Sequence, residues 1–346
     1  MTRRPTWLLL AALLAVAGCD AQPPIHATRF LAFGTLVDLT IAGVDSDRAE
    51  TATRAVEAYF AEMHREWHAW QPGPLQQVNE AIAAGRSITI PATIRPLLDR
   101  GLELSVASGG LFDPAIGRLV DLWGFHRDDP SEWTPPSDEQ IAPLLARPPR
   151  MTDLVIEGDQ LHSRNPLVKL DFGAYGKGYG IAQAMQRLKQ LGVHDAILNA
   201  GGDLSAMGRH LDRPWRVAIR HPRREGALAS LELHGEESVF TSGDYERAFT
   251  YQGKHYHHII DPRTGRPAQG TESVTVIDAD PTRADAAATA LFVAGPAEWY
   301  ATARTMHLRY VLLVDARGTL HMNPAMAERI QLLETPAVPV ELSPPL

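Results

Sequence analysis

VFTSGDYERAFTYQGKHYHHIIDPRTGRPA, residues 239–268, holds more reactive side chains than core packing needs. Its middle predicts a β-hairpin, with strands at 247–251 and 255–260 joined by a turn at Gln252-Gly253. His257 and His258 are adjacent in the second strand, and neighbouring strand residues point to opposite faces. We therefore expect functional residues in this stretch. One of the two histidines is expected to be a spacer, on the strand face opposite to the functional one.

A helix is expected soon after this stretch, at 281–293, and another at 296–305. Asp285 and Thr289 are four residues apart in the first of them and so share one helical face. Two oxygen ligands on one face suit a hard cation. The alternative is an Asp near a helix start together with a Thr that bonds back to its own helix.

A glycine-rich turn, Gly173-Ala174-Tyr175-Gly176-Lys177-Gly178, joins an expected buried strand at 168–172 to a helix at 181–191. Backbone N–H groups and a lysine at a helix N-terminus suit a phosphate, although the spacing is not that of a P-loop. The alternative is a plain turn with a surface lysine. Asp113, in Leu111-Phe112-Asp113-Pro114, either caps the next helix or serves as a ligand.

Strands interleaved with helices favour an α+β or mixed α/β domain. Periodicity predicts helices at 47–68, 76–84 and 93–108, strands at 30–41, 87–91, 194–199, 215–219, 230–234, 273–278 and 309–314, and a hairpin at 153–164. The segment 126–150 is rich in Pro and acidic residues, so we expect a surface excursion. The Pro-rich tail, 336–346, is expected to be a loose terminal segment.

The N-terminus has the parts of a secretory signal, with Arg3 and Arg4 before an apolar run that ends near Cys19. Val16-Ala17-Gly18-Cys19 resembles a bacterial lipobox, which would make residues 1–18 a signal peptide, Cys19 the lipidated first residue and 19–27 a linker. The alternative is a plain cleaved signal with an incidental cysteine. Asp20 resembles the residue that keeps such lipoproteins at the inner membrane, so we expect its periplasmic face.

The charge balance argues against a nucleic-acid partner. The whole chain has 33 basic and 41 acidic residues, a net charge of −8. Loss of residues 1–18 would remove two arginines and leave a net charge of about −10 from 31 basic and 41 acidic residues. An acidic protein of this kind is a poor ligand for a phosphate backbone.

Seven short motifs together resemble the ApbE family of FAD:protein FMN transferases. They are Phe33-Gly34-Thr35, Leu111-Phe112-Asp113-Pro114, DFGAYGKGY at 171–179, NAGGD at 199–203, TSGDYER at 241–247, HIIDPRTGRP at 258–267 and ADAAATALFV at 284–293. The resemblance implies an α+β, T-fold-like domain over residues 28–335, with mixed sheets and packed helices. It also implies FAD as a bound substrate and Mg²⁺ at its pyrophosphate.

The resemblance implies a role for each matching residue. The metal would be held by the side chains of Asp285 and Thr289 and by a main-chain carbonyl, that of Ala174. His258 would be the general base or would orient the acceptor hydroxyl. Asp261 would orient His258 or would take the proton itself. The positions that would contact FAD are Phe33, Trp70, Leu111, Phe112, Asp113, Lys177 and Ile260. The chain departs from the family pattern at Phe33, where Met is usual, and at Ala182, where Asp is usual.

The implied reaction moves FMN from FAD to a Thr or Ser hydroxyl of an acceptor redox protein and releases AMP. An unperturbed histidine pKa near 6.5 suits proton transfer at neutral pH, which favours His258 for that step. Two alternatives remain open. One is an FAD pyrophosphatase that gives FMN and AMP, and the other is a lipoprotein that binds FAD without turnover.

Overall fold

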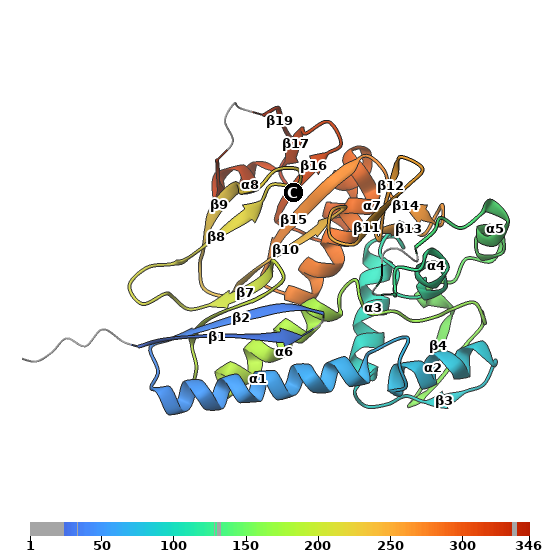
Figure 1. Cartoon of the computed structure of the whole chain (residues 1–346), viewed down its shortest axis with the longest axis horizontal. Helices are drawn as coiled ribbons and strands as arrows, with labels where there is room; N and C mark the ends of the chain where they lie inside the picture. The colour runs from blue at the N-terminus through green and yellow to red at the C-terminus, as the bar shows by residue number, and fades with distance from the viewer. Residues whose placement is uncertain (1–23, 33, 128, 130–132, 334–337) are drawn as a thin grey trace, which may run out of the picture.

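The computed structural model describes residues 24–32, 34–127, 129, 133–333 and 338–346. Over these residues nine strands form one sheet (Figure 1). Across the sheet they are β1 (Ile25–Ala32), β2 (Thr35–Ala42), β6 (Asp195–Ala200), β7 (Asp203–Met207), β10 (Glu237–Gly243), β15 (Thr271–Asp278), β16 (Tyr310–Asp315), β17 (Leu320–Met322) and β19 (Val340–Leu342). Neighbours are antiparallel except β17 and β19, which are parallel. With its interleaved helices, the chain has the predicted α+β architecture.

The first two strands form a hairpin where the sequence predicted a single strand at 30–41. Ala32 pairs with Thr35, and Gly34 between them has a φ of +70°. This left-handed conformation is one that glycine adopts with little strain. The single-strand prediction is wrong because the chain reverses at Gly34.

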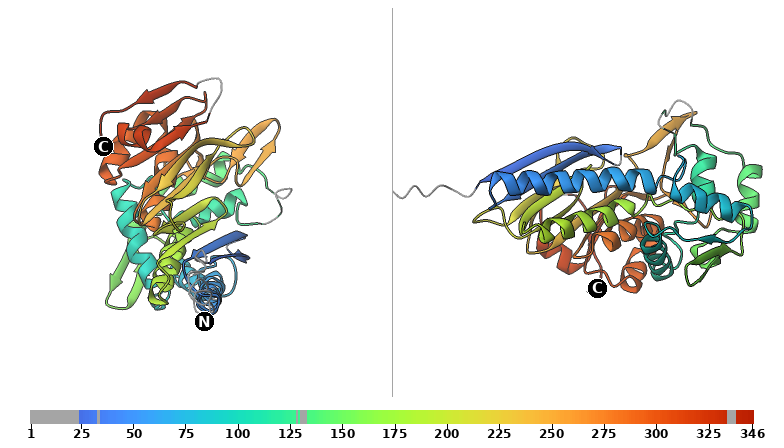
Figure 2. Two further views of the ribbon diagram at one scale, coloured as in Figure 1. Left: turned by 90° about the vertical axis from the view of Figure 1, so that its left-hand side faces the viewer. Right: turned by 90° about the horizontal axis from the view of Figure 1, so that it is seen from below.

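Three long helices cover one face of the sheet (Figure 2). They are α1 (Ser46–Glu66), α6 (Gly176–Gln190) and α7 (Pro281–Thr305). α7 packs on β10 and β15 and crosses α6, which in turn lies beside α1. Gly295 interrupts α7 with a φ of +67°, at the predicted boundary between the helices 281–293 and 296–305. The largest cluster of buried apolar residues fills the space between these helices and the sheet and continues into the elements beyond them.

The other face of the sheet carries a smaller layer. It consists of β8 (Trp215–Arg220), β9 (Ala227–Leu233), α8 (Pro324–Arg329) and β18 (Ile330–Leu332). Trp215, Leu231 and Met326 from this layer pack against Val239 and Leu312 of the large sheet. The central strands β10 and β15 are therefore buried on both faces, which holds the residues at their ends in fixed positions.

The remaining elements pack beyond one end of the sheet. They are α2 (Pro74–Ala83), β3 (Ile88–Thr89), α3 (Arg95–Ala107), α4 (Gly117–Trp123), α5 (Asp138–Ala146), β4 (Leu154–Glu157), β5 (Gln160–Ser163), β11 (Ala248–Tyr251), β12 (Lys254–His257), β13 (Ile260–Asp261) and β14 (Arg266–Pro267). The predicted hairpin with its turn at Gln252-Gly253 is confirmed as β11 and β12. Phe249 and Tyr256 of this hairpin join an aromatic cluster with Trp123 and Phe125.

Two other segments differ from the sequence predictions. The excursion 126–150 contains α5, which begins with a capping box formed by Ser137 and Gln140. This Ser-x-x-Gln pattern is a helix-start signal, and the prediction from proline and acidic content did not take it into account. Residues 168–172 form no strand, and Lys169 alone makes a parallel bridge to Ile116. Their burial comes from packing between helices and does not require a sheet.

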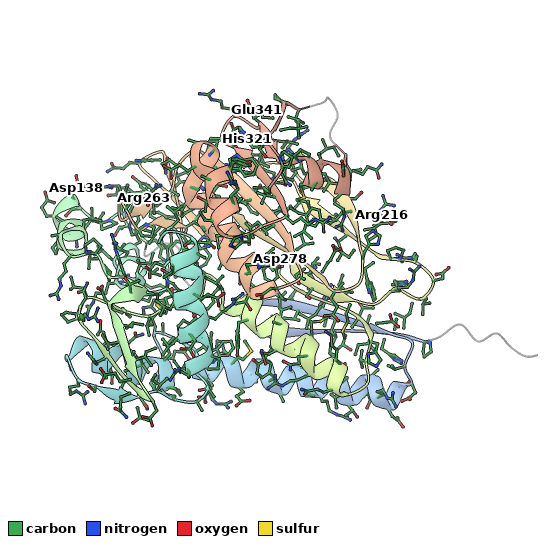
Figure 3. The ribbon with its side chains drawn as sticks, turned by 180° about the vertical axis from the view of Figure 1, so that it is seen from behind. Asp138, Arg216, Arg263, Asp278, His321 and Glu341 are labelled. Atoms are coloured by element: carbon green, nitrogen blue, oxygen red, sulfur yellow. The ribbon has the colours of Figure 1, made fainter. Side chains whose placement is uncertain are left out.

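The C-terminal residues form a strand, so the prediction of a loose tail is wrong over 338–346. β19 pairs with β17, and the Ser343 amide donates to the Met322 carbonyl at 3.0 Å. His321 of β17 lies between the carboxylates of Asp315 and Glu341 (Figure 3). The tail thereby extends the large sheet at one edge.

Several predictions fall on residues that the structure does not describe. These are the signal peptide at 1–18, the lipidation site Cys19 with the linker up to residue 23, and the flavin contact at Phe33. Among the described residues, no helix combines the length and the apolar character that crossing a membrane requires.

Candidate functional site

The first turn of α6 brings a lysine against a buried carboxylate. Lys177 forms an ion pair with Asp203, the first residue of β7. The other oxygen of Asp203 accepts a hydrogen bond from the Thr241 amide of β10 at 2.8 Å. Burial alone would lower the pKa of Lys177, but the carboxylates of Asp203 and Asp285 raise it above its ordinary value. Lys177 therefore stays charged at any physiological pH.

Asp285 of α7 meets the N-terminus of α6. One of its carboxylate oxygens accepts a hydrogen bond from the Gly178 amide at 2.7 Å. The helices approach closely here, because a Cβ on Gly178 would lie 2.4 Å from the Pro281 carbonyl oxygen and 2.7 Å from the Cβ of Asp285. Burial, and then the negative charge of Asp203, raise the pKa of Asp285 to about 8. A bound cation would offset the repulsion between these two buried carboxylates.

Thr289 lies one turn after Asp285, on the side of α7 that faces β10. Its hydroxyl is 3.2 Å from the hydroxyl of Ser242. It is not bonded back to its own helix, and the N-cap of α7 is Asp280 and not Asp285. The specific alternative of a Thr bonded back to its own helix is not seen among the described residues, and the ligand role of the pair stays a prediction. Ala174 lies two residues before α6, in the predicted turn, and is half-buried.

The donor set fits Mg²⁺ in its chemistry. Asp285, Thr289 and the Ala174 carbonyl offer oxygen only, and Mg²⁺ prefers oxygen and usually keeps positions for substrate phosphate and water. In the part of the chain that the structure describes, no group of three or more His, Cys, Asp or Glu side chains could hold a metal. A site with a single protein carboxylate would therefore depend on the ligand for part of its coordination.

His258 follows directly after β12 and is held by its main chain. Its amide donates to the Arg247 carbonyl at 3.0 Å. The ring atom Nδ1 is enclosed and has no hydrogen-bond partner among the described residues. Burial, and then the nearby His257 and Arg247, lower the pKa of His258 to about 3. The imidazole is therefore neutral at physiological pH and can accept a hydrogen bond.

His257 has the structural role expected of a spacer. It is buried, its Nε2 donates to the Ala268 carbonyl at 2.9 Å, and its Nδ1 accepts from the Ile259 amide at 3.3 Å. Its ring also packs edge-on against Phe292 of α7. Both ring nitrogens thus form hydrogen bonds with main-chain groups.

Asp261 is engaged by an arginine and not by His258. Both oxygens of its carboxylate accept hydrogen bonds from the Arg263 guanidinium, at 2.9 to 3.1 Å. Arg263 also pairs with Glu298 of α7 at 2.8 Å. Among the described residues no hydrogen bond joins Asp261 to His258, so the predicted orienting role has no contact to support it here.

Three of the predicted flavin positions have side chains that are turned into the core. Phe112 is 1% exposed and packs edge-on against Tyr175. Asp113 is buried and accepts hydrogen bonds from the amides of Ala115 and Met151, at 2.9 and 3.1 Å. Burial raises the pKa of Asp113 to about 6.

Asp113 does not cap a helix either, because the N-cap of α4 is Ile116. Ile260 is buried in the aromatic cluster. No free side-chain surface is therefore available to a ligand at Phe112, Asp113 and Ile260. Only the main-chain atoms of these residues are left to contact FAD. Leu111 is half-buried at the edge of the main core.

Trp70 stacks on His126, with ring centroids 5.2 Å apart and planes at 15°. Its Nε1 is buried without a hydrogen-bond partner among the described residues. Trp70 lines a pocket of about 300 Å³ together with Arg118, Asp121 and Lys169. A flat ring could enter beside it, which keeps Trp70 as a predicted flavin contact.

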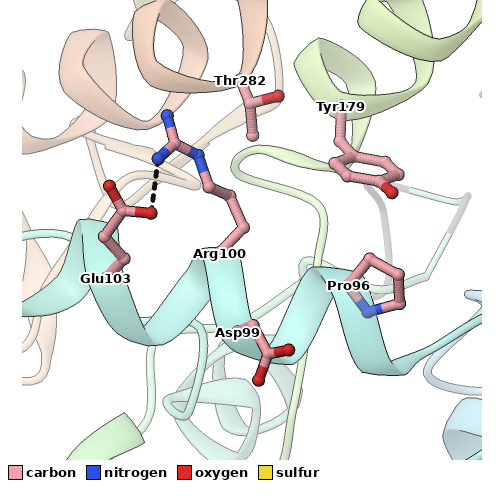
Figure 4. A pocket seen from close by; sticks show the side chains of 6 residues that line it. All are labelled: Pro96, Asp99, Arg100, Glu103, Tyr179 and Thr282. Atoms are coloured by element: carbon pink, nitrogen blue, oxygen red, sulfur yellow. Dashed lines mark hydrogen bonds and ion pairs between the residues drawn. The ribbon is translucent and has the colours of Figure 1, made fainter.

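A second pocket, of about 280 Å³, lies between α3 and the starts of α6 and α7 (Figure 4). Arg100 in this pocket pairs with Glu103 and with Asp280. Neither pocket is lined by His258, Lys177 or Asp285. The contacts around those three residues, and not the two pockets, therefore define the candidate site.

Three polar residues of the site were missed as candidates. Asp203 and Ser242 lie in motifs that the sequence shows, NAGGD and TSGDYER, but nothing in the spacing pairs them with Lys177 or Thr289. Asp171 starts the glycine-rich motif, and its carboxylate accepts from the Gly173 amide at 3.0 Å. Burial raises the pKa of Asp171 above its ordinary value.

Comparison with known proteins gives a consistent result. A model of the ApbE family matches residues 33–312. An FAD:protein FMN transferase of Rhodobacter capsulatus is 44% identical over 333 residues, which cover 95% of this chain and 64% of that protein. One of Klebsiella pneumoniae (strain 342) is 30% identical over 325 residues, which cover 90% of this chain and 92% of that protein. The chain thus spans less than two thirds of the Rhodobacter relative.

Solved structures agree with this. The ApbE protein of Thermotoga maritima is 27% identical, with a TM-score of 0.78 over 90% of this chain and 98% of that one. The flavinyl transferase ApbE of Pseudomonas stutzeri, in its apo form, is 31% identical, with a TM-score of 0.78 over 89% of this chain and 97% of that one. The predicted ApbE architecture is thereby confirmed.

Proposed function

The chain belongs to the ApbE family, and we propose that it transfers FMN from FAD to a Thr or Ser hydroxyl of an acceptor redox protein. The observation that carries this proposal is the grouping of a charged Lys177, the oxygen ligands Asp285 and Thr289, and a neutral His258. Phosphoryl transfer depends mainly on positioning and on neutralising charge, and this grouping offers both.

The bond changes are simple to state. The acceptor hydroxyl oxygen forms a bond to the phosphorus on the FMN side of the pyrophosphate. The bond from that phosphorus to the bridging oxygen breaks, AMP leaves, and the hydroxyl proton passes to a base. FMN remains attached to the acceptor through a phosphoester.

Lys177 and the oxygen ligands are suited to the pyrophosphate. Lys177 lies at the N-terminus of α6, where backbone N–H groups also favour an anion. Asp285, Thr289 and the Ala174 carbonyl would hold Mg²⁺. Bound there, the cation would neutralise charge on the phosphate oxygens.

His258 is the residue we assign to the acceptor hydroxyl. With a pKa of about 3 its ring is neutral, and because Nδ1 is enclosed, Nε2 is the ring nitrogen left to accept a hydrogen bond from a hydroxyl. Asp261 is occupied by Arg263, which makes it the weaker candidate for the base. The low pKa makes His258 a weak base by itself, so orienting the hydroxyl is its main contribution.

We also propose that Cys19 anchors the protein at the periplasmic face of the inner membrane. The support is the sequence alone: an apolar run after two arginines, small residues before the cysteine, and Asp20 after it. The acceptor would then be a periplasmic or membrane-attached redox protein.

The test is to follow the AMP that FAD yields, with and without an FMN-binding acceptor domain, in Mg²⁺ and in EDTA. The proposal predicts that AMP release requires both the acceptor and the metal, and that little free FMN forms. AMP and free FMN in equal amounts without an acceptor would indicate a pyrophosphatase. Bound FAD without any AMP would indicate a binding protein.

A further inference from the structure

An arginine outside the candidate site ties two acidic residues together at the base of the β11–β12 hairpin. Arg223 lies in the loop between β8 and β9. Its Nη1 and Nη2 donate to the two carboxylate oxygens of Asp244 at 2.6 Å each, and its Nε donates to Glu272 at 2.9 Å. Such a two-point contact fixes direction as well as distance. Both carboxylates are buried, whereas the Arg223 side chain is 43% exposed.

Asp244 connects this cluster to the hairpin. It directly follows β10 and precedes Arg247, whose carbonyl accepts from the His258 amide. The Asp244 carbonyl accepts from the Nε2 of His255 in β12 at 3.2 Å. The Asp244 amide donates to the Glu272 carbonyl at 3.1 Å, next to the large sheet. Asp244 is therefore bonded to the sheet on one side and to the hairpin on the other.

The hairpin needs such an anchor because it is not part of the large sheet. β11 and β12 form a sheet of two strands, and residues 250–255 around their turn are exposed. A hairpin of two strands is only marginally stable by itself. Its other support is the aromatic cluster, which holds Phe249 and Tyr256 at the opposite side.

We infer that Arg223 is a positioning residue for His258. It holds Asp244 against Glu272 and thereby fixes the position of the open end of the β11–β12 hairpin, from which His258 extends. The inference rests on the proposed function, in which His258 faces the acceptor hydroxyl. Arg223 itself touches neither His258 nor the oxygen ligands in the described hydrogen bonds, so its effect would pass through Asp244.

The chain offers a matched control for this inference. Arg329 makes a similar two-point contact with Glu237, with both distances at 2.8 Å. Glu237 begins β10 and Asp244 follows its end, so the two ion pairs flank the same strand. Asp244 is buried and the Glu237 side chain is 16% exposed, so loss of either arginine removes a two-point ion pair from a largely enclosed carboxylate, but only the Arg223 pair adjoins the hairpin.

The experiment compares the wild type with Arg223→Lys, Arg223→Met and Arg329→Met in the mature chain. We would measure kcat and KM for transfer, the FAD dissociation constant by flavin fluorescence, the melting temperature, and the NMR ring signals of His258. We expect kcat to fall about 10²-fold in Arg223→Met, as for a misplacement near 1 Å. FAD affinity should be unchanged, and Arg223→Lys should recover part of the rate.

Arg329→Met should lower the melting temperature without changing kcat or the His258 signals. A wild-type kcat in Arg223→Met would overturn the inference, and so would an equal loss of kcat in Arg329→Met. If the wild type transferred no FMN, the proposed function would fail, and the NMR signals would still decide the inference. Signals of His258 that are the same in Arg223→Met and the wild type would contradict it.

Discussion

At the scale of single residues, the adjacent histidines show how the fold separates a structural side chain from a reactive one. Both ring nitrogens of His257 are hydrogen-bonded to main-chain groups, those of Ala268 and Ile259. The Nδ1 of His258 is enclosed without a partner among the described residues. A polar atom buried in this way costs free energy, which is commonly accepted where a group has a function.

Replacing His258 with Ala should lower the rate of FMN transfer by about 10²-fold, as for a reacting hydroxyl that is no longer held in position. FAD should still bind, because Lys177 and the oxygen ligands remain. His234→Ala, at an exposed histidine in the loop between β9 and β10, serves as the control. The rate is measured from AMP release, and FAD binding from flavin fluorescence. Transfer at the wild-type rate in His258→Ala would show that our assignment is wrong.

The raised pKa of Asp285 predicts how stability depends on pH without metal. The unfolded chain ionises this carboxyl group near its ordinary pKa of 3.8, whereas the folded protein keeps the proton up to about pH 8. Across that window the folded state binds more protons, so the free energy of unfolding should fall as pH rises. Asp113, with a pKa of about 6, adds an effect of the same sign below pH 6.

Melting curves of the wild type and Asp285→Asn, in EDTA and in Mg²⁺ from pH 5 to 8.5, isolate the contribution of Asp285. In EDTA the wild type should lose stability with pH more steeply than Asp285→Asn. Mg²⁺ should stabilise the wild type more at high pH, because the metal binds the ionised carboxylate. Equal Mg²⁺ stabilisation of both proteins would argue against Asp285 as a ligand.

The residues of the site could be predicted from the sequence only where one element holds them together. Asp285 and Thr289 share a helical face, so their spacing of four is informative. Asp203 and Ser242 come from separate strands, and only the pairing of β7 with β10 brings them to Lys177 and Thr289. The burial of Phe112 could not be predicted either, because the motif does not indicate which way its side chains point.

At the scale of elements, the crossing of α6 and α7 shapes the site. Gly178→Ala should destabilise the protein, because the added Cβ would lie 2.4 Å from the Pro281 carbonyl oxygen. Overpacking of this kind costs about 1–3 kcal/mol. It should also weaken FMN transfer, because the Gly178 amide holds Asp285.

Gly176→Ala is the matched control for that crossing. A Cβ there would meet Phe172 at 3.5 Å, which is ordinary contact, and helix propensity favours Ala over Gly. Chemical denaturation of both variants gives the comparison. A Gly178→Ala protein as stable as Gly176→Ala would contradict the close approach of the helices.

Long helices could be predicted well and short reversals poorly. The heptad-like positions Val56, Phe60 and Met63 identified α1, and Gly295 with Pro296 marked the interruption in α7. The hairpin at Gly34 was missed because its short reversal lies inside what resembles one continuous strand, and β19 was missed because it pairs with β17, about 20 residues earlier in the chain. Local sequence carries no signal for pairing at such a distance.

At the scale of the whole molecule, the order of strands in the large sheet assembles the site. β7, β10 and β15 are central neighbours, and α6 and α7 cross above them. The glycine-rich motif, NAGGD, TSGDYER and the α7 motif therefore meet, although they are spread over residues 171–293. This explains why these four motifs, each weak alone, can be specific together.

The C-terminal strand lies at the edge of this sheet and away from the site. Deleting residues 338–346 would remove the main-chain hydrogen bonds of Leu320 to Pro339 and of Ser343 to Met322, at 2.8 and 3.0 Å. We expect a loss of about 1–3 kcal/mol in the free energy of unfolding, at 0.5–1.5 kcal/mol for each bond. The kcat for transfer should not change. A large loss of activity in a protein that remains folded would show that the edge contributes to the site.

The most direct test of the central claim is the intact mass of a purified FMN-binding acceptor domain after incubation with this protein, FAD and Mg²⁺. We predict that the acceptor gains the mass of one FMN in phosphoester linkage, at a Thr or Ser. The gain should be absent in EDTA and strongly reduced with His258→Ala. An acceptor whose mass stays unchanged, while FAD is bound or split to FMN and AMP, would contradict the transferase assignment.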